Sequence, residues 1–360
     1  MLTYPAGIIK YAQEEKRSLD NMTRKQMNMH GSLHPRADVD RLYVPRKSGG
    51  RGLLSVEDSI NKEENSISQY IKTSTEPILK LTTEILLNKS PVPKETYTDN
   101  IRSKRMEAWS QKKLHGMWPK NLEKQSTQSN SWLQKSNLKP PTEALITAAQ
   151  DQALLTKWHK TNITKTTTDP LCRRCGKFNE TVAHIVSGCP ELAQGVYLSR
   201  HNAVAGYIHW KLCKRENLPC SSSWYDHEPH KVVENENIKV LYDFTIRTDK
   251  KIEHRKPDLV IHRKREGKTI IVDFACPMDH NVETKEKEKI DHYTDLKFEL
   301  EKIWKTRIKI IPIVIGALGT VTKNLEDHLK SIDMADVRVH QLQKCVLLKT
   351  GNILRKHLCT

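Results

Sequence analysis

The sequence predicts a mixed α/β domain at the C-terminal end, preceded by mostly α-helical modules and a small Cys/His module. The apolar fraction is 37% of 360 residues and the mean hydropathy is -0.65, which suits modules joined by polar segments. From residue 232 onward, β-branched runs alternate with helix-like segments. Between Cys172 and Cys189, Cys and His residues follow the spacing of a metal-ligand set.

The first segment, 1–87, is predicted to be a small helical module. Helices are expected at 13–29, where His30 and Gly31 stop the first one, and at 56–71. Between them lies a glycine-rich turn that carries the basic candidates for nucleic-acid contact Arg46, Lys47 and Arg51. Glycines let a backbone approach a ligand closely, but a plain helix–loop–helix explains this turn equally well.

The second segment, 88–141, is predicted to be a basic polar linker. Residues 100–139 contain nine Lys or Arg against two Glu, with three interleaved tryptophans: Trp109, Trp118 and Trp132. Single-stranded nucleic acid needs such cations and stacking faces. We favour amphipathic helices that bury the tryptophans. The candidate nucleic-acid contacts here are Arg102, Lys104, Arg105, Lys112 and Lys113.

The third segment, 142–218, is predicted to begin with a helix at 142–160 and to contain a structural zinc site. The ligands are Cys172, Cys175, His184 and Cys189, in the pattern C-x2-C-x8-H-x4-C. Three thiolates and one imidazole form a closed tetrahedral set that suits zinc. Arg173 and Arg174 are expected to offset the thiolate charge and to contact nucleic acid. A further pair, His209 and Cys213, shares a helix face with apolar residues and is interpreted as packing.

The fourth segment, 232–360, is predicted to be the α/β domain. Strands are expected at 239–247, 258–263, 268–275 and 307–315, and helices at 282–304, 323–331 and 338–356. Asp258 and Asp273 flank a turn at Gly267, so a hairpin can bring their carboxylates together. Two such carboxylates hold Mg²⁺ or Mn²⁺, which activates water for phosphodiester hydrolysis.

Nucleases of the PD-(D/E)XK type place a Lys two residues after the second acid, where this chain has Ala275. The following helix offers replacements, namely Lys285, Lys289, His292 and Tyr293. We favour Lys289, assisted by Tyr293, and leave Lys285 open. The bland alternative is a pair of solvated strand-end aspartates beside an ordinary charged helix.

The net charge of the chain indicates which class of partner to expect. The formal net charge of +17 favours a polyanion such as nucleic acid. No apolar run is long enough to span a membrane, and the apolar patch at 6–9 is too short for a signal peptide. The eight cysteines are therefore expected to be thiols or metal ligands.

Nearly the whole chain after Gly7 resembles non-LTR (LINE-type) retrotransposon polyproteins that carry a restriction-like endonuclease. The resemblance is carried by Asp273 and by several stretches that follow the family's order. These stretches are MHGSLHPRADVDRLY at 29–43, GGRGL at 49–53, AAQDQAL at 148–154, the Cys172–Cys189 knuckle, RKPD at 255–258, EKIDHYTDL at 288–296 and VIGALG at 314–319.

The resemblance implies a thumb-like module at 1–87 and a zinc knuckle and endonuclease that bind and nick target DNA, priming reverse transcription of the element RNA. It implies Asp258 and Asp273 as metal ligands, Lys289 as the catalytic lysine, and nuclear location, with a cytoplasmic ribonucleoprotein stage. The polymerase portion of the element is a possible partner. This chain contains no Asp-Asp pair, so polymerase activity is not implied, and a truncated or domesticated copy is expected.

Two other functions stay open. A non-catalytic nucleic-acid-binding module would keep the knuckle and the basic segment without cutting DNA. A structure-specific nuclease such as a junction resolvase is an analogy of fold alone.

Overall fold

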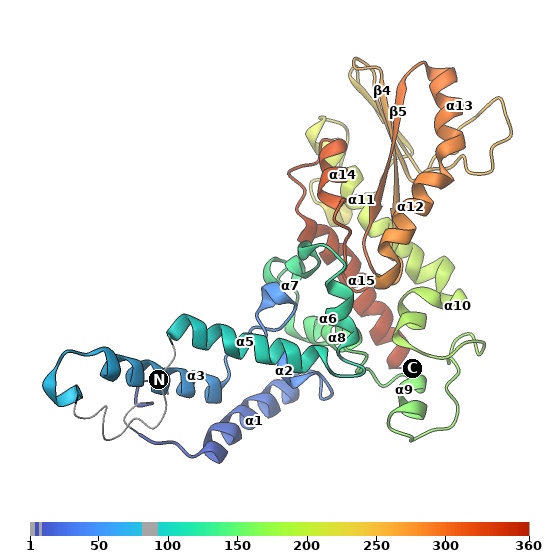
Figure 1. The fold of residues 1–360 in the computed structure, drawn as a ribbon. Coiled ribbons are helices and arrows are strands. Elements are labelled where there is room, and N and C mark those ends of the chain that lie inside the picture. The colour runs from blue at the N-terminus through green and yellow to red at the C-terminus, as the bar shows by residue number, and fades with distance from the viewer. Residues whose placement is uncertain (1–3, 7–8, 81–92, 360) are drawn as a thin grey trace. The chain divides into compact units, whose positions relative to one another are not determined.

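The computed structural model describes residues 4–6, 9–80 and 93–359. These residues form two compact units, one from 1–120 and 139–152, the other from 121–138 and 153–360. Residues 88–141, expected as a linker, contribute to both units, and their described part is largely helical. Figure 1 shows the helices and strands of both units.

The first unit is helical. Its helices are α1 (Gln13–Met29), α2 (Val39–Tyr43), α3 (Val56–Thr73), α5 (Lys94–Ser110), the start of α6 (Met117–Leu122), and α8 (Pro140–Gln150). The helices predicted at 13–29 and 56–71 are confirmed as α1 and α3. Ser55 begins α3 because its hydroxyl accepts a hydrogen bond from the Asp58 N–H at 3.1 Å, which satisfies an otherwise unpaired helix-terminal donor.

A buried arginine organises this unit. Arg41 is 1% exposed, and its guanidinium lies 2.7 Å from Asp151 Oδ1 and 4.8 Å from the centre of the Trp109 ring. Its Nε also donates to the Gly49 carbonyl at 3.0 Å. Because a buried charge is stable only when it is paired and hydrogen-bonded, this one side chain ties α2, the glycine-rich turn, α5 and α8 together.

The glycines of the 46–53 turn serve the fold. A Cβ on Gly50 would lie 2.0 Å from the Val44 carbonyl oxygen, so only glycine fits there. Gly52 has a φ of 69° and donates its N–H to the same carbonyl at 2.9 Å. The chain thus folds back on the end of α2. A plain helix–loop–helix therefore accounts for the glycines without a bound ligand.

The second unit contains a five-stranded mixed sheet in the order β1-β2-β3-β4-β5. Its strands are β1 (Val232–Glu234), β2 (Ile238–Tyr242), β3 (Leu259–Arg263), β4 (Lys268–Ala275) and β5 (Arg307–Val314). The first four strands pair antiparallel, and β5 pairs parallel with β4. The α-helices of this unit are the end of α6, α7 (Ser131–Lys135), α9 (Lys157–Asn162), α10 (Pro190–Leu192), α11 (Leu198–Arg215), α12 (Val282–His292), α13 (Thr294–Trp304), α14 (Leu325–Ser331) and α15 (Val339–Leu358).

Helices cover both faces of the sheet. Alternate residues such as Ile261 and Ile270 pack on one face with α11, α14 and α15. Their neighbours Val260 and Ile271 pack on the other face with α13 (Figure 1). Strands buried on both faces read as continuous β-branched runs, which is why the segments 258–263 and 268–275 could be predicted.

Three predicted elements are wrong in extent. The strand expected at 239–247 ends at Tyr242 because Asp243 has a φ of 45°. The helix expected at 142–160 ends at Gln150; Gln152 has a φ of 56°, and a new helix, α9, begins after Thr156. The helix expected at 282–304 is two helices, which meet at Tyr293.

The three tryptophans of the basic segment are buried, as the favoured interpretation predicted. Trp109, Trp118 and Trp132 are 0%, 4% and 1% exposed, so their rings offer no stacking face to a nucleic acid. Among the described residues, no helix is both long enough and apolar enough to cross a membrane.

Candidate functional site

The backbone around the first cysteines forms a tight turn. The Cys172 N–H donates to the Phe178 carbonyl at 2.8 Å, and the Gly176 N–H donates to the Cys172 carbonyl at 2.8 Å. Gly176 has a φ of 64°, which lets the chain reverse after Cys175. His184 opens the π-helical segment His184–Gly188.

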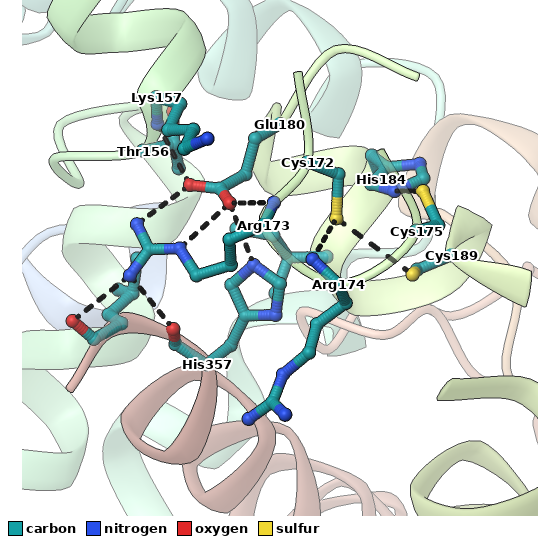
Figure 2. A network of polar contacts seen from close by, with 12 residues as sticks. Thr156, Lys157, Cys172, Arg173, Arg174, Cys175, Glu180, His184, Cys189 and His357 are labelled. Atoms are coloured by element: carbon teal, nitrogen blue, oxygen red, sulfur yellow. Dashed lines mark hydrogen bonds and ion pairs between the residues drawn. The ribbon is translucent and has the colours of Figure 1, made fainter. Parts of the chain in front are cut away.

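The four predicted ligands converge. Their ligand atoms all lie within 4.8 Å of one another, and the cluster could hold a metal ion. Cys172 Sγ is 4.0 Å from Cys189 Sγ, and Cys175 Sγ is 3.4 Å from His184 Nε2 (Figure 2). The structure therefore brings together all four residues that the sequence spacing predicted as ligands.

A buried carboxylate anchors this module. Glu180 is fully buried and lies 2.9 Å from the Arg173 guanidinium and 3.1 Å from His357 Nε2 (Figure 2). It also accepts the Lys157 N–H at 2.9 Å. Burial raises the pKa of Glu180, but the hydrogen bonds from His357 and Arg173 outweigh it and hold that pKa below its usual range. The network ties the cysteine turn to α9 and to the end of α15.

The expected role of the two arginines in the turn is partly wrong. The Arg173 guanidinium pairs with Glu180 and donates to the His357 carbonyl at 3.1 Å, so its charge serves the anchor and not the thiolates. The backbone N–H of Arg174 donates to Cys172 Sγ at 3.4 Å, while its side chain points away from the sulfur atoms (Figure 2).

The two predicted aspartates lie at the same end of the β3–β4 hairpin. Leu259 pairs with Val272, so one step further along the ladder Asp258 stands opposite Asp273. The Phe274 N–H donates to Asp258 Oδ2 at 2.8 Å, which holds that carboxylate against β4. The hairpin thus brings the two residues next to each other, and the Asp258 carboxylate is close enough to raise the pKa of Asp273.

Asp273 is nearly enclosed. It is 1% exposed, and its two oxygens meet two predicted side chains: Tyr293 donates to Oδ1 at 2.8 Å, and Lys289 Nζ lies 2.6 Å from Oδ2. Burial first, and the Asp258 carboxylate second, raise the pKa of Asp273 to about 6, although Lys289 and Tyr293 act in the opposite direction. Such an environment is typical of functional carboxylates.

Asp258 has a partner that the sequence analysis missed. His201, on α11, places Nε2 at 2.9 Å from Asp258 Oδ2 and at 3.1 Å from the Phe274 carbonyl. Burial lowers the pKa of His201, but Asp258 outweighs burial and raises it to about 9. Burial likewise raises the pKa of Asp258, while His201 and the Phe274 N–H hold it below 3.8. One feature of the sequence could have indicated His201: it lies one helical turn before Ala205, on the side of α11 that Ala205 and Ile208 bury in the core.

The structure separates the two candidate lysines. Lys289 reaches Asp273, whereas Lys285 pairs with Glu288 at 2.6 Å on the exposed side of α12. Ala275, at the position where PD-(D/E)XK nucleases have their Lys, is a buried part of β4. His292 stacks on His254, with ring centroids 3.3 Å apart.

Five of the ten predicted nucleic-acid contacts are held in ion pairs with carboxylates that are at least partly buried. Arg46 and Arg51 pair with Glu143, and Arg105 pairs with Asp40 and Asp58. Lys112 pairs with Asp38 and Asp40, and Arg173 pairs with Glu180. The other five side chains are exposed, namely Lys47, Arg102, Lys104, Lys113 and Arg174. Arg102 also lies 3.2 Å from Asp99 on its own helix.

Neither a comparison with protein-family models nor a search of curated proteins gave a match. The functional assignment therefore rests on the geometry of the two clusters and on the sequence motifs that form them.

Proposed function

We propose that this chain is the C-terminal part of a LINE-type non-LTR retrotransposon reverse transcriptase and that it is a metal-dependent DNA endonuclease. The observation that carries the proposal is the facing pair Asp258 and Asp273, with Lys289 held 2.6 Å from the second carboxylate. The mixed sheet with helices on both faces supports a restriction-like domain of the PD-(D/E)XK class. Polymerase chemistry is not part of the proposal.

The Cys/His cluster is proposed to hold a structural zinc ion. Zn–S distances of about 2.3 Å and Zn–N distances of about 2.0–2.1 Å in a tetrahedron require sulfur atoms about 3.8 Å apart and a sulfur and a nitrogen about 3.6 Å apart. The observed separations are 4.0 Å for Cys172 and Cys189, and 3.4 Å for Cys175 and His184. Both separations lie within about 0.2 Å of the tetrahedral values, and four protein ligands leave no position for a substrate.

Asp258 and Asp273 are proposed to hold Mg²⁺ or Mn²⁺. Carboxylate oxygens are the ligands that these hard cations prefer, and Asp273 on β4 and Asp258 directly before β3 supply them at one end of the hairpin. The raised pKa of Asp273 supports this assignment, because part of the shift comes from a facing carboxylate that a cation would neutralise. When bound, the metal would activate water and stabilise charge on the scissile phosphate.

The surrounding side chains have distinct proposed roles. Lys289 is a cation that reaches the carboxylates from α12, where it replaces the lysine missing at position 275 and stabilises the negative charge that develops during cleavage. Tyr293 orients Asp273, since its hydroxyl donates to Oδ1 at 2.8 Å. His201 orients Asp258 from the opposite side.

The proposed partners are target DNA and the element RNA. The net charge of +17 attracts phosphate through release of condensed counterions. The exposed cations, among them Lys104 and Lys113, are better placed to contact phosphate than those paired inside the fold. Target priming would require a nuclear location, with a cytoplasmic ribonucleoprotein stage and the polymerase portion of the element as an associated partner.

A second candidate function is a non-catalytic nucleic-acid-binding module with the same zinc site. It is favoured by one observation: each aspartate already lies beside a cation, Asp258 beside His201 and Asp273 beside Lys289. Ion pairs of this kind also perturb pKa values in purely structural networks.

Cleavage of supercoiled plasmid distinguishes the two functions. The full chain is expected to convert plasmid to nicked circles with Mg²⁺ or Mn²⁺ and to stop when a chelator captures that metal. Plasmid binding is measured in parallel and should weaken steeply with salt. Protein that binds plasmid but never nicks it with either metal would establish the second function.

A further inference from the structure

A second Cys/His cluster lies in the C-terminal unit. His209 and Cys213 are one turn apart on α11, and His227 reaches them from the segment that follows α11 in the sequence. The three ligand atoms lie within 4.8 Å of one another. His209 Nδ1 is 2.7 Å from His227 Nε2 and 3.6 Å from Cys213 Sγ.

His209 and Cys213 are buried, as their interpretation as packing residues predicts, but the arrangement also allows a second role. Both residues are 0% exposed, and apolar side chains would fill the same space without polar atoms to satisfy. His227 is separated from Cys213 by thirteen residues and is itself 9% exposed. Three nitrogen and sulfur donors from two segments of the chain therefore converge and could hold a metal ion.

We propose that His209, Cys213 and His227 bind a second zinc ion. Two imidazoles and one thiolate are the donors that zinc prefers over Mg²⁺ or Ca²⁺. The separation of His209 Nδ1 from Cys213 Sγ, 3.6 Å, equals the value of about 3.6 Å for a tetrahedral site. The two imidazole nitrogens, at 2.7 Å, need to separate by about 0.6 Å to share one ion.

Three protein ligands leave a fourth coordination position. Cys220 is exposed on the connecting loop, seven residues from both Cys213 and His227, and a water molecule is the other candidate ligand. The ion would fasten the loop after α11 to the helix. His209 also packs edge-on against Tyr242 of β2, with ring centroids 5.3 Å apart, so the same ion would steady α11 on the sheet.

The position on α11 links this cluster to the carboxylate site. His201, the partner of Asp258, is eight residues before His209, or about 12 Å along the helix axis at about 1.5 Å per residue. A metal that fixes the far end of α11 would help to hold His201 in place. The ion itself is proposed as structural and takes no part in cleavage.

Zinc content per chain tests the proposal on the purified full-length protein. The wild type is expected to hold one more zinc ion than either Cys213→Ala or His227→Gln. Cys345→Ala is the matched control, because Cys345 is also buried on a helix of this unit and belongs to no ligand cluster among the described residues. His227→Gln lies in a loop, so it guards against loss of metal through misfolding of α11.

A third variant separates this proposal from the zinc knuckle. Cys175→Ser should remove the knuckle ion alone, and Cys175→Ser with His227→Gln should remove both. Substitution with Co²⁺ gives a second readout, since the absorption of tetrahedral cobalt should decrease in Cys213→Ala, His227→Gln and Cys175→Ser and stay unchanged in Cys345→Ala. Wild-type zinc content that His227→Gln and Cys213→Ala both leave unchanged would overturn the second site, whatever the Cys175→Ser result.

Discussion

Lys289 Nζ lies 2.6 Å from Asp273 Oδ2, although the two residues belong to different elements and are sixteen positions apart. The PD-(D/E)XK pattern places its lysine on the strand of the second acid, and here the cation comes from helix α12 instead. In the proposed nuclease, this contact would supply the lysine of the two-acid-and-lysine grouping from a different element.

Replacing Lys289 by Met should lower the rate of Mg²⁺-dependent nicking by about a hundredfold, the typical cost of removing one group that stabilises transition-state charge. Plasmid affinity should change little, since one cation among many is lost. Single-turnover nicking rates measure the effect. Lys285→Met is the matched control, because Lys285 is one turn earlier on the same helix and pairs with Glu288. Equal rates for the two variants would contradict a catalytic role for Lys289.

The affinity of the carboxylate pair for metal should decrease when the pH is lowered below about 6. Burial and Asp258 raise the pKa of Asp273 from 3.8 to about 6, so Asp273 is protonated below that pH and a metal must displace the proton. Affinity for Mn²⁺ should therefore be constant above about pH 7 and decrease roughly tenfold per pH unit well below the pKa. Calorimetric titration checks this. An affinity that is unchanged down to about pH 5 would place the metal elsewhere.

His201 should stay protonated through neutral pH in the metal-free protein. Burial lowers its pKa, and the Asp258 carboxylate outweighs burial to raise it to about 9, so its charge should disappear only as the pH rises through that value. Imidazole chemical shifts followed by NMR give the titration directly. Asp258→Asn should lower the pKa of His201, because Asp258 contributes most to opposing burial, while the smaller effects of Asn202 and Asp273 remain. If the pKa of His201 does not change in Asp258→Asn, the two side chains do not interact.

Glu180→Gln should destabilise the C-terminal unit by about 3–5 kcal/mol, the usual effect of removing one partner from a buried ion pair. The Arg173 guanidinium would lose its carboxylate, and His357 would lose the acceptor that lies 3.1 Å away. Urea unfolding measures the change. Glu191→Gln, at an exposed position on α10, should cost less than about 1 kcal/mol. Similar losses from both variants would mean that Glu180 does not anchor the module.

Much of the C-terminal domain could be predicted from the sequence because its signals are local. The β-branched run before Asp273 predicted β4, and the turn at Gly267 predicted the hairpin that sets Asp258 opposite Asp273. The C-x2-C-x8-H-x4-C spacing likewise predicted that Cys172, Cys175, His184 and Cys189 lie together. In each case the residues that meet are joined by a short segment whose conformation the sequence constrains.

The remaining contacts depend on how distant segments pack. His201 meets Asp258 across 57 residues, and no local pattern connects a helix end with a strand end so far away. His227 joins His209 only because the intervening loop folds back on α11. Arg51 and Arg173 were assigned to nucleic acid because a sequence shows their charge but not the buried carboxylates that neutralise it.

The central claim is that Asp258 and Asp273 together hold the metal that cuts DNA, and the direct test is the nicking rate of Asp273→Asn at saturating protein. Asp327→Asn, an exposed change on α14, serves as its control. The account predicts that Asp273→Asn abolishes Mg²⁺-dependent nicking, binds plasmid as tightly as wild type, and no longer binds Mn²⁺ at the carboxylate pair. An Asp273→Asn protein that nicks plasmid as fast as the wild type would contradict it.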